Sequence, residues 1–157
     1  MLIAVETSAQ STANASATAT ILTAISITKI VDMNFGNVSV QAQTGGSVIL
    51  STVGVRSATG GVTLPATGGT VTAASFTVTG ATMYTYSITL PTTPFTITSG
   101  TTNNMTVTAF TSTPSVSGTL TGGTQNLNVG ATLNIAAAQP AGLYTSTTGF
   151  TVTVNYN

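Results

Sequence analysis

Apolar and polar residues alternate with a period of two along much of this chain. From residue 13 to residue 27 the odd positions are apolar except at Thr23: Ala13, Ala15, Ala17, Ala19, Ile21, Ile25 and Ile27. The even positions from Asn14 to Thr20 are all polar. A period of two places one set of side chains on one face of a strand, whereas a helix needs apolar residues three and four positions apart. We therefore predict one long strand, or two strands in series, over 13–27.

The same alternation predicts further short strands over 35–40, 47–52, 70–79, 83–90, 95–98, 105–110 and 127–135. The closing segment from residue 150 is the clearest, because Phe150, Val152, Val154 and Tyr156 share one face and Thr and Asn occupy the other. Prolines and four Thr-Gly-Gly triplets, at 44–46, 59–61, 67–69 and 121–123, fall between these runs. Many short strands separated by Gly/Pro turns are typical of a β-sandwich or barrel. The triplets lack the fixed period of a β-solenoid.

Composition supports an all-β chain of one domain. The 157 residues suffice for one core. Threonine is the commonest residue, and its branched Cβ suits a pleated, half-buried surface. No apolar run approaches the roughly 18 residues of a membrane-spanning helix, so we expect a protein that is not membrane-embedded.

Charge is the least usual property of the sequence. Charged residues make up 3% of the chain, and they are Glu6, Lys29, Asp32 and Arg56. An ordinary soluble domain carries about 25%. A net charge of zero leaves no basic patch, which excludes nucleic acid as a partner. A nearly uncharged surface suits a protein that packs against copies of itself, although an ordinary secreted domain with a Thr/Ser surface is the alternative.

The chain offers little for catalysis or metal binding. It contains no Cys and no His, so disulfides, thiolates and imidazoles are excluded. With two carboxylates and no base to activate a hydroxyl, we expect no enzyme, no cofactor and no metal site. Lys29 and Asp32 are expected to form a surface pair at a strand end, with a Lys–Asn isopeptide crosslink as the less favoured alternative.

Three segments resemble one group of bacterial proteins. Residues 32–38, Asp-Met-Asn-Phe-Gly-Asn-Val, resemble the Phe-Gly step after the first strand of spore coat U-type chaperone–usher pilins. Residues 130–135 with 139–144, which include Ala-Gly-Leu-Tyr, resemble their late strand and its turn, and residues 150–157 resemble their closing strand. From about residue 19 onward the chain is also similar to the bacterial surface family called domain of unknown function 4402. Many spore coat U-type pilins carry a Cys pair that this chain lacks.

The resemblance implies an incomplete Ig-like β-sandwich with an N-terminal donor-strand arm. We expect the arm over residues 1–22 and the sandwich over 23–157. The arm would insert the side chains of Ala13, Ala15, Ala17, Ala19 and Ile21 into the groove of an adjacent subunit. The acceptor groove would be bordered by Ile25, Ile27, Phe150, Val152, Val154 and Tyr156.

The resemblance also implies a function and partners. The chain would be a structural subunit of an extracellular bacterial pilus or fibre, with copies of itself as partners and possible help from a periplasmic chaperone and usher. The alternative is a self-contained surface adhesin or lectin-like domain, in which residues 13–27 form the first strand of a complete sandwich.

Overall fold

A computed structural model describes residues 1–4 and 8–157 of the chain. All regular secondary structure in this part is β-strand, and no helix in it is long and apolar enough to cross a membrane. The strands are β1 Ser26–Val31, β2 Ser39–Val40, β3 Gly46–Leu50, β4 Arg56–Gly60, β5 Val62–Thr63, β6 Ala74–Thr79, β7 Thr85–Thr89, β8 Phe95–Ser99, β9 Asn103–Thr113, β10 Ser117–Thr119, β11 Thr124–Ile135 and β12 Thr153–Tyr156.

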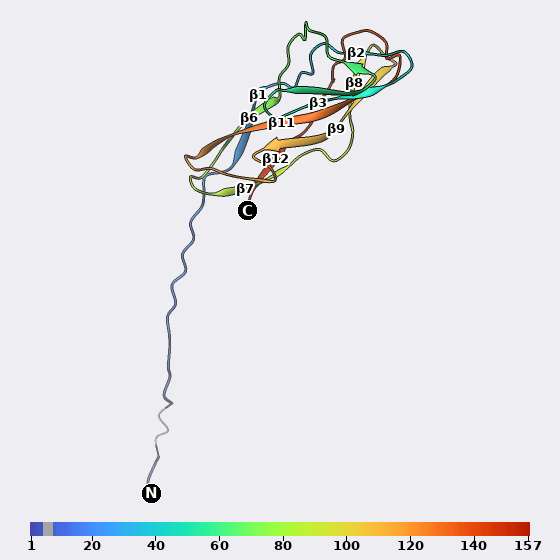
Figure 1. Cartoon of the computed structure of the whole chain (residues 1–157). Helices are drawn as coiled ribbons and strands as arrows, with labels where there is room; N and C mark the ends of the chain where they lie inside the picture. The colour runs from blue at the N-terminus through green and yellow to red at the C-terminus, as the bar shows by residue number, and fades with distance from the viewer. Residues whose placement is uncertain (5–7) are drawn as a thin grey trace.

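The long strand β11 organises the larger sheet (Figure 1). Along one edge β11 pairs first with β6 and then with β3, and along the other edge it pairs with β9. The change from β6 to β3 occurs around Gly130, where any Cβ would collide with the carbonyl oxygen of Leu50. Glycine therefore permits two strands to meet β11 end to end. β1 flanks β6, β4 flanks β3 and β8 flanks β9, which makes seven strands.

A smaller sheet of order β10-β7-β12 packs on one half of the larger sheet. The core between them contains Tyr86, Val78 and Leu127, whose exposed fraction is 0%. Over the other half, the larger sheet is covered by the segment around Phe35 and by the short β2–β5 pair. Met33 and Phe110 pack against both clusters and so join the two halves of the core.

The structure confirms the expected all-β, Ig-like sandwich. The predicted alternation of the closing strand is confirmed, because Val152 and Val154 are buried while Thr151, Thr153 and Asn155 are exposed. Strands β4, β5 and β10 were not predicted, since they are short and carry little alternation. The strand predicted over 13–27 is wrong in extent, because pairing begins only at Ser26.

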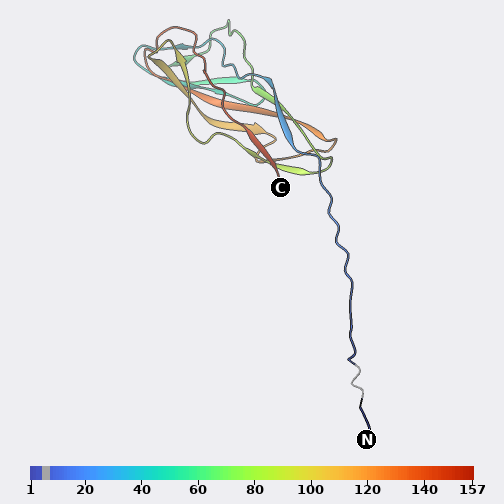
Figure 2. The same cartoon turned by 180° about the vertical axis from the view of Figure 1, so that it is seen from behind.

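Residues 8–22 extend away from the sandwich in both views (Figures 1 and 2). Residues 8–24 are all exposed, and Ile21 is 96% exposed. No residue from 8 to 22 forms a hydrogen bond with another described residue. We call residues 1–22 the arm; Glu6, the only charge predicted in it, lies outside the described residues.

Tyr86 makes the stability of the core sensitive to alkaline pH. Its hydroxyl donates to Gln125 Oε1 at 2.8 Å, and burial raises the pKa of Tyr86 above the ordinary value of 10.0. Above pH 10 the unfolded chain loses this proton while the folded chain retains it, so the free energy of unfolding should fall as pH rises further. Urea titrations between pH 7 and about 11 should show this decline, and Tyr86→Phe should make it shallower. An unchanged pH slope in Tyr86→Phe would contradict the assignment.

Candidate functional site

Two strand edges on the same side of the sandwich have no partner strand in the described residues. β1 pairs only with β6, and β12 pairs only with β7. On the opposite side, backbone bonds of 2.8 and 2.9 Å between Thr98 and Thr145 join β8 to the segment that leads into β12. The sandwich is therefore closed along β8, whereas no backbone hydrogen bond joins β1 to β12 among the described residues; we call this the open side.

An apolar groove enters the core beside this open side. Its volume is about 830 Å³, within the range of specific binding pockets and far larger than the voids of an ordinary core. One wall is the end of β1 with the segment that follows it, and the other wall is residues 139–146 with Phe150. The floor comes from β6, β8, β9 and β11, through Phe76, Phe95, Ile97, Met105, Val107 and Leu133.

Phe150 stands at the centre of an aromatic cluster along the groove. Its ring centroid lies 5.0 Å from that of Phe110, 6.0 Å from Phe95 and 6.4 Å from Phe76. The contacts with Phe76 and Phe95 are edge-to-face, the arrangement that aromatic quadrupoles favour. Phe150 is only half buried, so apolar surface remains available to an occupant of the groove.

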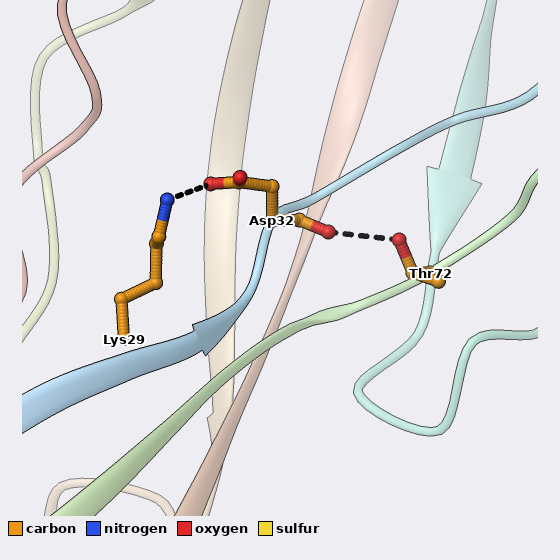
Figure 3. A network of polar contacts seen from close by, with 3 residues as sticks. All are labelled: Lys29, Asp32 and Thr72. Carbon is orange, nitrogen blue, oxygen red and sulfur yellow. Dashed lines mark hydrogen bonds and ion pairs between the residues drawn. The ribbon is translucent and has the colours of Figure 1, made fainter.

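Hydrogen bonds fix the wall that follows β1 (Figure 3). Lys29 Nζ lies 2.7 Å from Asp32 Oδ1, with side chains 55% and 79% exposed, which confirms the predicted surface pair. Such an exposed pair contributes little stability. Thr72 Oγ1 donates to the backbone oxygen of Asp32 at 2.8 Å, and Asn34 exchanges two backbone hydrogen bonds with Thr72.

Arg56 supports the same wall from β4. Its guanidinium donates to the backbone oxygens of Phe35 and Asn37, which lie on either side of Gly36. Gly36 has a φ of +68°, a conformation that glycine adopts without strain. Arg56 therefore acts as a clamp that holds Phe35 in the core and keeps this wall of the groove in place.

The opposite wall is held by a small polar network. Gln139 Nε2 donates to the backbone oxygen of Asn104 at 3.0 Å and to Tyr144 Oη at 2.9 Å. Tyr144 Oη in turn donates to the backbone oxygen of Pro140 at 2.8 Å. Leu143, which lies between Pro140 and Tyr144 in the chain, lines the groove and is 81% exposed. Both walls are thus tied to the sheets, and the groove is preformed.

The structure places the predicted donor and acceptor residues in separate regions. Ala13, Ala15, Ala17, Ala19 and Ile21 are exposed on the arm and contact no groove. The six predicted acceptor residues, Ile25, Ile27, Phe150, Val152, Val154 and Tyr156, all pack in the core cluster beneath the smaller sheet. Of these six, Phe150 alone also lines the groove.

Most groove residues were missed as functional residues from the sequence. The sequence predicted only strands or turns at six residues that line the groove: Met33, Phe35, Phe95, Ile97, Met105 and Leu133. The alternation of apolar and polar residues predicts which face of each strand is buried. It does not predict which of the buried side chains border an unfilled space. The resemblance at residues 32–38 and 139–144 was the one available signal, since both segments become groove walls.

Comparison with known proteins identifies the family. The family described as "Domain of unknown function (DUF4402)" matches residues 25–156, which is most of the chain. The chain belongs to the DUF4402 family. No curated protein and no solved structure matches it. The DUF4402 match begins one residue before β1 and ends with β12, so it covers both groove walls and leaves the arm outside.

Among the described residues, the groove of this DUF4402 domain has charged side chains only at its rim. Asp32 is the only carboxylate side chain in the described part of the chain, and it is paired with Lys29 at the rim. The lining is mostly apolar, and both neighbouring strand edges present backbone donors and acceptors. An uncharged, extended segment with one apolar face satisfies both features.

Arg56→Met should test whether the clamp maintains the groove. Removing hydrogen bonds from a charged donor to two carbonyl oxygens should cost roughly 1.5–3 kcal/mol of unfolding free energy. Both hydrogen bonds come from the same nitrogen, Nη1, so Arg56→Lys should recover part of this loss, limited by the shorter and more flexible lysine side chain. Urea denaturation measures the difference. Equal stability of wild type and Arg56→Met would show that the clamp contributes nothing.

Proposed function

We propose that this chain is a structural subunit of an extracellular bacterial fibre, in which the arm of one subunit fills the groove of the next. The observation that carries the proposal is the pairing of an exposed, alternating arm with an unfilled apolar groove in the same molecule. The resemblance to chaperone–usher pilins agrees with this function. A chaperone and an usher are accordingly the proposed assembly partners, and the cell surface the proposed location.

The arm matches the groove in pattern. Residues 13–21 would span roughly 30 Å as a strand, a length comparable with a small sandwich. The apolar face of this segment would lie on the core, and Asn14, Ser16, Thr18 and Thr20 would face outward. Each buried alanine methyl adds about 0.8 kcal/mol, so the backbone hydrogen bonds to the edges of β1 and β12 supply much of the specificity.

The arm is too closely joined to β1 to fill its own groove. Only four residues, 22–25, separate Ile21 from the start of β1. A hairpin back along β1 needs a tight turn, but Leu-Thr-Ala-Ile contains no Gly, Asn, Asp or Pro. A strand parallel to β1 needs a crossover of about a dozen residues. The arm must therefore act on another copy, and arm-to-groove contacts that repeat in this way build an open filament.

Deletion of the arm tests the proposal. A chain lacking residues 1–22 should remain monomeric under conditions in which the full chain polymerises, because no donor strand is present. Light scattering and electron microscopy measure polymer formation. Polymers of normal appearance from the truncated chain would contradict strand donation.

A synthetic peptide of residues 12–22 should bind the truncated chain. Ala17→Asp in this peptide should weaken binding by roughly 3–5 kcal/mol, because an unpaired carboxylate would enter the core. Thr18→Asp is the matched control on the outward face and should bind nearly as well as the original peptide. Calorimetry gives the affinities. A full chain that stays monomeric and a truncated chain that binds no peptide would instead favour a self-contained adhesin or lectin-like domain.

A further inference from the structure

The hydroxyl of Tyr156 connects the last strand to the base of the arm. It donates to the backbone oxygen of Thr23 at 2.8 Å and accepts a hydrogen bond from the backbone N–H of Ala81 at 2.6 Å. Tyr156 ends β12, Thr23 precedes β1, and Ala81 follows β6. One side chain therefore connects β12 to the segment that precedes β1 and to the turn that follows β6.

The position of the Tyr156 ring is fixed by its neighbours. The ring meets Tyr84 edge-on, with centroids 6.0 Å apart and planes at 64°. On another side lies Gly80, where any Cβ would collide with the Tyr156 hydroxyl oxygen. Glycine at this position leaves room for the hydroxyl between Ala81 and Thr23. The contact is thus part of the packed end of the sandwich, although the Thr23 residue itself is exposed.

Thr23 is the outermost hydrogen-bonded residue at the base of the arm, because no residue from 8 to 22 forms a hydrogen bond within the described part of the chain. Exposure changes over the same few positions, since Ile25 is half buried, Leu22 is 37% exposed and Ile21 is 96% exposed. Only Leu22 lies between the held Thr23 and Ile21, the last apolar residue of the arm's alternating face.

We propose that Tyr156 is a positioning residue that fixes the direction of the arm and makes the joint between consecutive subunits short and stiff. The inference rests on the proposed function and deepens it. If Ile21 is buried in the neighbouring subunit and Thr23 is held by its own Tyr156, a single residue bridges the two sandwiches. One residue of extended chain spans about 3.3 Å, which leaves the two bodies little freedom to tilt.

The direction of the arm can be measured in a single chain. Because the sequence has no Cys, spin labels can be placed by Thr20→Cys on the arm and Asn126→Cys on β11. Ala17→Asp in the same chain keeps the arm out of other grooves. Tyr156→Phe should broaden the distance distribution between the labels. Loss of the hydrogen bond to Thr23 changes the ratio of molecules with a held arm base to molecules with a released one roughly fivefold.

Tyr84→Phe is the matched control. It removes a hydroxyl from the ring that packs on Tyr156, and that hydroxyl has no hydrogen-bond partner among the described residues. Its distance distribution should equal that of the unsubstituted labelled chain. Thermal melting of each variant shows whether the sandwich has remained folded.

Fibre stiffness tests the consequence for assembly. In electron micrographs, Tyr156→Phe fibres should bend more, with a persistence length reduced by about twofold or more. Insertion of Gly-Ser between Leu22 and Thr23 should soften the fibre even with Tyr156 intact, because Gly/Ser linkers are flexible. This second variant keeps the test valid if Tyr156→Phe folds poorly.

Unchanged distances and unchanged stiffness in Tyr156→Phe would overturn the inference while leaving strand donation in place. Absence of wild-type fibres together with absence of arm-peptide binding would overturn the proposed function and the stiff joint with it. In that case the distance measurement alone still shows whether Tyr156 holds the base of the arm.

Discussion

The outer edges of β1 and β12 present backbone amide and carbonyl groups that no strand of the described chain satisfies. Exposed edges of this kind invite pairing with a further strand, and here the end of β1 borders a groove of about 830 Å³ in the core. In the proposed assembly, one extended segment supplies both the missing pairing and the missing apolar packing.

The groove is preformed because its walls are held independently of any occupant. Arg56 binds the carbonyl oxygens around Gly36 on one side, and the Gln139–Tyr144 pair holds the other side. A rigid site loses less conformational entropy when a strand enters, which favours binding. Of the three described charged residues, Arg56 is a clamp in this scaffold, whereas Lys29 and Asp32 form an exposed pair at the rim that contributes little stability.

Tyr156 shows how a residue of the closing strand acquires a role that its pattern does not reveal. Alternation placed it correctly on the inner face with Val152 and Val154. Its hydroxyl, however, reaches Thr23 across the sandwich, 133 positions away in the chain. Tyr156 thus lies in β12, at the edge of the smaller sheet, and also holds the base of the arm. In the proposed assembly, it connects the acceptor side of a subunit to that subunit's own donor arm.

Local pattern alone determined the strand character of this chain, the inner face of most strands and the turn positions of its prolines. These features follow from side-chain alternation and backbone preference, which act over a few residues. Only the tertiary structure decided that Gly130 lets β6 and β3 meet on β11, that Phe35 and Phe95 face an unfilled space, and that Arg56 and Tyr156 act as clamps. Each of these depends on segments far apart in the sequence, whose pairing is set by the packing of the whole sandwich.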